Sequence, residues 1–238
     1  MAQRFDCILS NAQLEPTSPD APAGSSPRRI AVELATAYGL ILSVLWTPRP
    51  WQRLLWGVAA AGVAAIVIFS NQRLARWGLQ WTGLLRFLWV AVAAMLVSAC
   101  ALAMAAHFHT LHMPHHHQGL WSSWWGYILW AASQQFLLQD FFLARIERIV
   151  RGERAAALAA AGLFAAAHLP NPLLTALTLL WGFLACLHFM RYRSLYPLAA
   201  ARAILGITLA IIVPGPIIHN MHVGLGYLTY TPPRSPQP

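Results

Sequence analysis

The chain has 238 residues, of which 58% are hydrophobic and only 10% are charged, and its mean hydropathy is +0.53. Soluble domains carry about 25% charged residues, so this composition excludes a soluble globule and predicts a membrane protein. The net charge of +9 comes from sixteen arginines set against seven acids. No basic stripe with interleaved aromatic residues accompanies that charge, so we expect no nucleic-acid partner and interpret the arginines as topology signals.

Seven apolar runs follow a Pro-, Ser- and Ala-rich N-terminal segment. They lie at about 30–46, 54–70, 83–106, 122–144, 155–169, 173–190 and 195–213. About 20 residues cross a bilayer, so the runs predict an all-α, polytopic transmembrane helical bundle of about seven spans, in which the fifth run is short. The expected parts are a disordered cytoplasmic tail (1–29), three N-terminal transmembrane helices (30–106), a His-rich outer loop (107–121), a four-helix core (122–213) and a C-terminal outer tail (214–238).

The arginines are distributed unevenly between the connections of these spans. With the N-terminus in the cytoplasm, twelve arginines fall inside, three fall outside and Arg202 lies within the membrane. The positive-inside rule therefore predicts an N-in, C-out orientation in the cell inner (plasma) membrane, with the lipid bilayer as the surrounding partner.

The fourth run carries a polar cluster that includes Gln134, Gln135 and Asp140. On a regular helix Asp140 is rotated by roughly 140° from Gln135, so we expect it to face elsewhere, as a structural acid near the cytoplasmic arginines. The two glutamines either form interhelical hydrogen bonds or contact a substrate or cofactor. Arg202 in the seventh run needs a partner, which Gln134, Gln135, Asp140 or a bound anion could supply.

The fifth run, 155–167, consists almost entirely of Ala, Gly, Leu and Phe and leads to His168, after which Pro170 and Pro172 end the helix. Small side chains let neighbouring backbones approach, so we expect this helix at the centre of the bundle. A titratable side chain in lipid is costly, and His168 should therefore face protein or a water-filled cavity.

Residues 134–206 resemble the CAAX-protease and bacteriocin-processing family of intramembrane peptidases. The resemblance rests on Phe164-x-x-x-His168, on the start Leu195-Tyr196-Pro197 of the last run, and on the position of the Gln134-Gln135 pair. The family has two adjacent glutamates at that pair, of which the first activates water, and histidines that bind the catalytic water or a metal and stabilise the oxyanion. In this chain Gln134 and Gln135 replace the glutamates, Arg202 replaces a histidine, and Gly206 replaces an Asn or Asp.

The resemblance implies an intramembrane endopeptidase-like protein with candidate catalytic positions His168, Gln134, Gln135 and Arg202. A glutamine amide cannot take a proton from water near neutral pH, so we predict that glutamate-dependent peptidase activity is absent. The alternative function is a non-catalytic structural or assembly subunit of a larger membrane complex, in contact with other membrane-protein subunits and with lipid, pigment or haem.

Six histidines within eleven residues form a second candidate site, because neutral imidazole is a common metal ligand. They are His107, His109, His112, His115, His116 and His117. Their spacing matches no defined motif, so both a divalent-metal site and a solvated, pH-sensitive loop remain open. We expect the hydrogen bonds of His188 to be satisfied within the helical bundle. The segment 217–230, with His219 and His222, is expected to be an outer cap or a partner-docking strip. The cysteines Cys7, Cys100 and Cys186 are expected to be packing residues.

Overall fold

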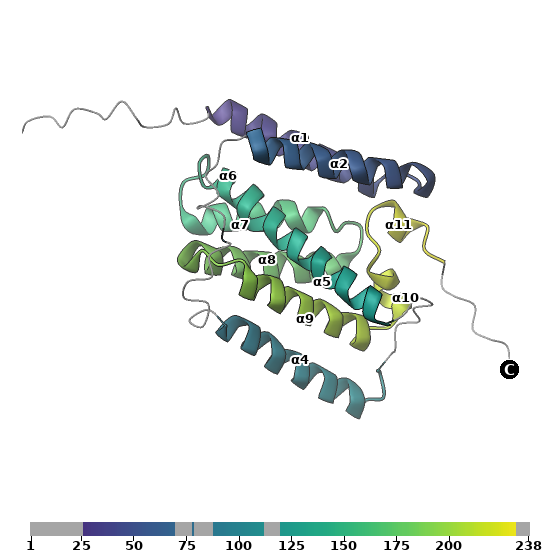
Figure 1. Ribbon diagram of the computed structural model, residues 1–238. Helices are drawn as coiled ribbons and strands as arrows, with labels where there is room; N and C mark the ends of the chain where they lie inside the picture. Colours follow the sequence, from purple (N-terminus) through teal and green to yellow (C-terminus); the bar gives the residue numbers. More distant parts are fainter. Residues whose placement is uncertain (1–25, 70–77, 79–87, 112–119, 232–238) are drawn as a thin grey trace, which may run out of the picture.

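The computed structural model describes residues 26–69, 78, 88–111 and 120–231, and in this part of the chain every regular element is a helix (Figure 1). This confirms the all-α prediction. The elements are α1 (Pro27–Leu45), α2 (Arg49–Phe69), α4 (Trp89–His107), α5 (Leu120–Phe136), the π-helix η2 (Leu137–Leu143), α6 (Ala144–Ile146), α7 (Glu153–Ala166), α8 (Pro172–Tyr192), α9 (Tyr196–Ile212), α10 (Gly215–Ile218), the 3-10 helix η3 (His219–Met221) and α11 (Leu225–Leu228).

Helix ends follow the local capping signals. Ser26 accepts a hydrogen bond from the Arg29 amide at 3.3 Å, and Pro27 opens α1. Asn171 accepts one from the Leu174 amide at 3.1 Å, and Pro172 opens α8. Proline is favoured in the first turn because the first helical N–H groups have no partner within the helix. Of the two prolines that follow His168, Pro172 therefore also starts α8, the helix of the sixth apolar run.

Three described helices are long and apolar enough to cross a membrane by length and composition: α2, α4 and α8, with mean hydropathies of 1.7, 2.2 and 1.9. The apolar α9 is shorter. The chain is therefore a membrane protein embedded in lipid through apolar helices. The fourth apolar run is divided among α5, η2 and α6, so its apolar length is not carried by a single α-helix.

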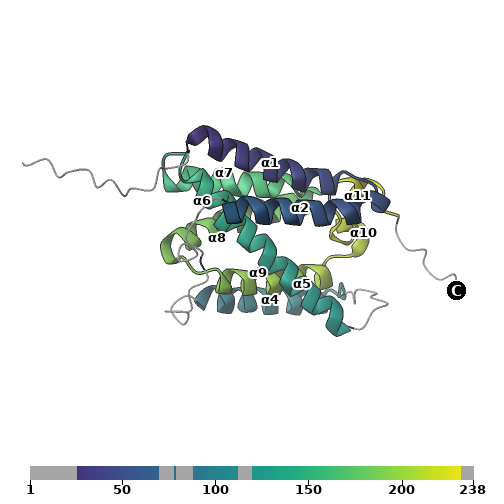
Figure 2. The same cartoon turned by 45° about the horizontal axis from the view of Figure 1, so that its top comes forward.

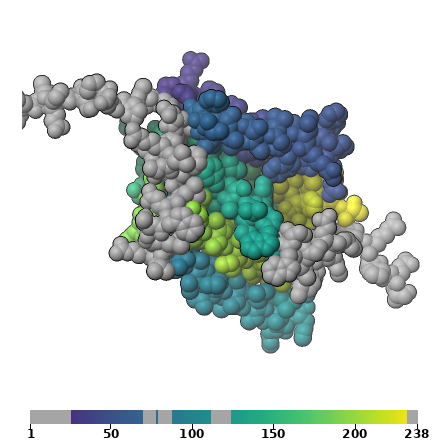
Figure 3. Space-filling view, viewed as in Figure 1, coloured from purple at the N-terminus to yellow at the C-terminus, as the bar shows by residue number. Residues whose placement is uncertain are grey.

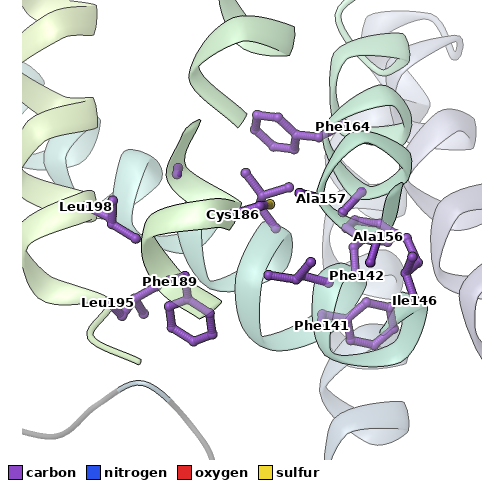
Figure 4. Packing of buried hydrophobic residues seen from close by; sticks show 14 of the residues in the cluster. Phe141, Phe142, Ile146, Ala156, Ala157, Phe164, Cys186, Phe189, Leu195 and Leu198 are labelled. Carbon is purple, nitrogen blue, oxygen red and sulfur yellow. The ribbon is translucent and has the colours of Figure 1, made fainter. Parts of the chain in front are cut away.

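The helices are arranged as packed pairs. α1 lies beside α2, α7 beside α8, and both α4 and α5 pack along α9 (Figures 1 and 2). In the space-filling view the α1–α2 pair covers the top of the molecule and α4 its lower edge (Figure 3). Between these layers, η2 contributes Phe141 and Phe142 to the main core, where α8 contributes Cys186 and Phe189 (Figure 4).

The small residues of α7 allow close helix packing, as predicted. Its buried alanines include Ala160 and Ala161, and a Cβ added to Gly182 of α8 would lie 3.3 Å from the Ala161 Cβ. Of the three cysteines expected to be packing residues, Cys186 is buried, whereas Cys100 is exposed, so that expectation is wrong for Cys100. Cys100 lies on α4, a span-length helix with a largely unburied surface, where an apolar thiol can face lipid; Cys7 lies outside the described residues.

One buried ion pair connects α1 to the core. The Arg145 Nε lies 3.0 Å from the Glu33 Oε2, and the Arg145 side chain is 1% exposed. Its guanidinium also donates to the Phe141 carbonyl at 3.2 Å and stacks 3.9 Å from the Phe141 ring centroid. Burial lowers the pKa of Arg145, which lies just beyond the fourth apolar run, and the Glu33 carboxylate opposes this shift. Glu33 is thus the counter-ion that permits Arg145 to be buried.

We predict that Glu33→Gln lowers the free energy of unfolding by about 3–5 kcal/mol, because it leaves the Arg145 charge buried without its counter-ion. Unfolding in mixed detergent micelles measures the change. Glu147→Gln is the matched control, since it removes a half-buried carboxylate 3.3 Å from the exposed Arg193 and should cost about 1 kcal/mol or less. Equal losses in the two variants would contradict a structural role for the Glu33–Arg145 pair.

Candidate functional site

The fourth apolar run is not one regular α-helix, and its polar residues have different partners. The α-helix α5 ends at Phe136, and the π-helix η2 follows it. The expectation that Asp140 lies on a regular α-helix is therefore wrong. The Asp140 Oδ1 accepts a hydrogen bond from the Gly78 amide at 3.0 Å. Asp140 therefore anchors the Gly78 backbone, and the predicted structural role of this acid is confirmed.

Gln134 is the partner of Arg202. The Gln134 Oε1 accepts hydrogen bonds from the Arg202 Nε at 3.1 Å and from its Nη2 at 2.7 Å. The prediction that Arg202 needs a partner in the membrane, with Gln134 among those able to supply one, is confirmed. These bonds join α9 to α5 and use two of the five donors of the guanidinium.

Arg202 and His168 meet across an aromatic ring. The Arg202 guanidinium lies 4.9 Å from the Phe164 ring centroid, and that ring makes an edge-to-face contact with the His168 ring at 5.0 Å. His168 is 6% exposed, as expected for a histidine that faces protein. Its Nδ1 donates to the Phe164 carbonyl at 2.8 Å, which leaves the lone pair on Nε2 as the acceptor of the neutral ring.

Gln135 forms a separate hydrogen bond. This fully buried residue accepts a hydrogen bond from the Trp181 Nε1 at 3.1 Å, while its Nε2 has no partner among the described residues. Of the four predicted positions, Gln134 is connected to His168 through Arg202 and the Phe164 ring, and Gln135 bonds to α8 instead. Both glutamines form interhelical hydrogen bonds, one of the two roles considered for them.

Tyr127 is a site residue that sequence reasoning missed. A Cβ added to Gly206 would overlap the Tyr127 hydroxyl oxygen, so this hydroxyl occupies the space that a side chain at position 206 would need. Tyr127 lies seven residues before Gln134, which places both on one face of α5. That spacing is the signal that could have identified it. Trp181 was also missed, because it resembles the other tryptophans of the apolar runs.

The histidines outside this cluster have different surroundings. His107 and His109 are exposed, whereas the other four members of the predicted metal site lie outside the described residues. No group of three or more His, Cys, Asp or Glu side chains suited to a metal occurs among the residues that the structure describes. The His188 ring contacts Trp89 and Tyr192, but its Nε2 is buried without a hydrogen-bond partner in this part of the chain, so the expectation of a satisfied histidine is wrong.

The C-terminal segment is folded against the loop that carries His168. The Asn171 side-chain amide donates to the Ile218 carbonyl at 2.9 Å, and the Gly224 amide donates to the Leu169 carbonyl at 2.8 Å. His219 stacks on Tyr227 with 3.9 Å between ring centroids. The segment therefore caps the end of α7 and the start of α8, as one of the two expectations for residues 217–230 proposed.

A cavity of about 890 Å³ adjoins the Arg202 cluster. Its walls come from α4, α5, α8 and α9 with part of the C-terminal cap, and its polar side chains include Arg202, Tyr127 and His188. Most other lining residues are Leu, Val, Ala or Trp. The site thus combines a half-buried cation with a largely apolar chamber that is large enough for a small-molecule ligand.

We predict that Gln134→Leu destabilises the protein by about 1–3 kcal/mol, because two donors of the half-buried Arg202 guanidinium lose their acceptor. The double variant Gln134→Leu/Arg202→Leu should lose less than the sum of the two single variants, since both interacting groups are then removed. Unfolding free energies in mixed micelles provide this cycle. Additive losses would contradict direct coupling of Gln134 and Arg202.

Comparison with known proteins identifies the region that contains this cluster. Residues 116–208 match the family model described as Type II CAAX prenyl endopeptidase Rce1-like. No curated protein and no solved structure matches the chain. The matched residues include Tyr127, Gln134, His168 and Arg202, and the resemblance deduced from the sequence motifs is confirmed. Over residues 116–208 this membrane protein is therefore similar to the CAAX prenyl endopeptidases.

Proposed function

We propose that this chain is an intramembrane peptidase-like protein of the cell inner (plasma) membrane that has kept the helical core of the CAAX proteases and lost their glutamate-dependent hydrolysis. The observation that carries the proposal is the hydrogen bonding of Arg202 to the Gln134 Oε1. At the position where the resemblance implies a water-activating carboxylate, the chain has a neutral amide whose oxygen is already occupied by a cation.

The chemistry of the remaining side chains supports the same proposal. An amide oxygen cannot accept a proton from water near neutral pH, and a guanidinium has no lone pair for that purpose. The Nε2 of His168 is the one basic nitrogen of the cluster, and Arg202 could stabilise an oxyanion. A carboxylate that would activate water is missing from the matched positions.

The side chains at the matched positions also do not fit a catalytic metal. His168 is the one metal-ligating type among them, and the others are two amides, a guanidinium and a glycine. These positions therefore supply one metal ligand, fewer than the three protein ligands of a typical catalytic zinc site.

Restoring the family's side chains tests the lost hydrolysis. We predict that the unmodified protein does not cleave membrane-embedded or prenylated peptides, whereas a variant with Gln134→Glu, Gln135→Glu, Arg202→His and Gly206→Asn gains cleavage. The Asn would overlap the Tyr127 hydroxyl, so the restored variant also needs Tyr127→Ala. Mass spectrometry of the peptide products detects the activity, and the same variant with His168→Ala is the control.

Cleavage by the unmodified protein that His168→Ala abolishes would overturn the proposal, because His168 would then act as the base. If the protein does not cleave and instead purifies in mild detergent with other subunits, the result favours the alternative role as a structural or assembly subunit. Purification as a monomer together with cleavage would favour the enzyme.

The proposed topology has seven spans with the N-terminus in the cytoplasm, and the twelve-to-three distribution of arginines supports it. In a cysteine-free background, we predict that Arg151→Cys reacts with a membrane-impermeant thiol reagent only from the cytoplasmic side and Leu111→Cys only from the outside. Both residues are exposed, so accessibility should depend on the side of the membrane. Labelling of both positions from one side would contradict seven spans.

A further inference from the structure

Two arginines line the cavity, Arg191 and Arg202. Arg191 is exposed, whereas Arg202 is half-buried and has no counter-ion in the described part of the chain. The acidic residues in the described part of the chain are Glu33, Asp140, Glu147 and Glu153. Glu33 pairs with Arg145 and Glu147 with Arg193, Asp140 accepts from Gly78, and Glu153 is exposed in the first turn of α7. The Gln134 amide contacts Arg202 but carries no charge. A cation at a helix centre costs at least about 2.5 kcal/mol, so an anion in the cavity would stabilise the site.

The remaining walls of the cavity suit an apolar chain. Beyond Arg202, α9 contributes Leu205, Leu209 and Ile212 to the lining. Arg202 and Ile212 are ten positions apart in the sequence, which corresponds to roughly 15 Å along the helix axis. Tyr127 and His188 add polar groups to the lining, and the His188 Nε2 has no partner among the described residues. The cavity therefore offers polar groups and a long apolar wall in one space.

The cavity is open toward the lipid-facing side of the bundle. Val97 of α4 and Leu180 and Leu184 of α8 belong to its lining and are exposed. α4 packs along α9, whereas α8 packs along α7, so these two lining helices belong to different pairs (Figure 1). In a bilayer these exposed side chains face acyl chains, which gives an amphiphile direct access to the cavity from the membrane.

We propose that this cavity is a binding site for an anionic amphiphile, whose carboxylate or phosphate head pairs with Arg202 while its hydrocarbon chain lies along Leu205, Leu209 and Ile212. The guanidinium fork matches both kinds of oxyanion. This site does not depend on the absence of hydrolysis, because it uses the charge of Arg202 and the apolar walls and involves no reaction.

Native mass spectrometry of the full-length protein, released from zwitterionic detergent, tests the proposal. One equivalent of a long-chain fatty acid should bind, and its methyl ester, which has the same chain without the charge, should bind about tenfold more weakly or worse. A phosphatidic acid should bind like the fatty acid. Inorganic phosphate alone should neither bind nor displace the fatty acid, because it lacks the chain.

Variants connect the binding to Arg202 and to the cavity. Arg202→Gln should remove the preference for the acid over the ester, Arg202→Lys should retain it, and Arg154→Gln, an exposed arginine of α7, should leave it unchanged. Ala101→Trp, which fills the cavity from α4, should lower the affinity for acid and ester alike. Thermal unfolding checks that each variant is folded, and Ala101→Trp tests the site without altering Arg202.

The proposal would be overturned by equal binding of acid and ester to the unmodified protein, by an unchanged preference in Arg202→Gln, or by displacement of the fatty acid by inorganic phosphate. The last outcome would assign Arg202 to a free anion instead of an amphiphile. Unchanged fatty-acid affinity in folded Ala101→Trp would place the bound molecules outside the cavity and would equally contradict the proposal.

Discussion

Every charge buried among these apolar helices must find an acceptor within the protein, because the surrounding lipid offers none. Arg145 meets this requirement with the Glu33 carboxylate, and in doing so it joins α1 to the core. Arg202 meets it only in part, through the neutral oxygen of Gln134. The same constraint thus gives one arginine a structural role and leaves the other beside a cavity with an unbalanced charge.

Small residues determine how closely the helices around these arginines can approach. Gly182 lets α8 pack against the alanine face of α7, and Gly206 leaves room for the Tyr127 hydroxyl between α5 and α9. Without a hydrophobic driving force between helices in lipid, such close packing supplies much of the attraction. Glycine at position 206 therefore has a packing function in this chain, in addition to being a departure from the family motif.

The residues that differ from the CAAX-protease motif fit one another. Gln134 accepts the hydrogen bonds of Arg202, Arg202 lies over the Phe164 ring, and Tyr127 occupies the space that Gly206 leaves open. Replacing Gly206 by a larger residue would create an overlap with the Tyr127 hydroxyl, and replacing Arg202 would remove the donors that Gln134 accepts from. These contacts describe a rebuilt polar cluster, and the proposed loss of hydrolysis and the proposed anion site both follow from its new charge: a glutamine replaces a carboxylate and an arginine replaces a histidine.

The sequence by itself determined the all-α membrane class, the approximate limits of the helices and the burial of His168, because apolar runs, prolines and small residues act locally along the chain. It also indicated that Arg202 needs a partner, without deciding among Gln134, Gln135, Asp140 and a bound anion. Only the tertiary structure decided that choice, together with the direction of Asp140, the contact of Trp181 with Gln135 and the position of Tyr127. The physical reason for the direction of Asp140 is that η2 departs from the regular helical pitch. The other contacts join residues that are distant in the chain, so they depend on how whole helices pack.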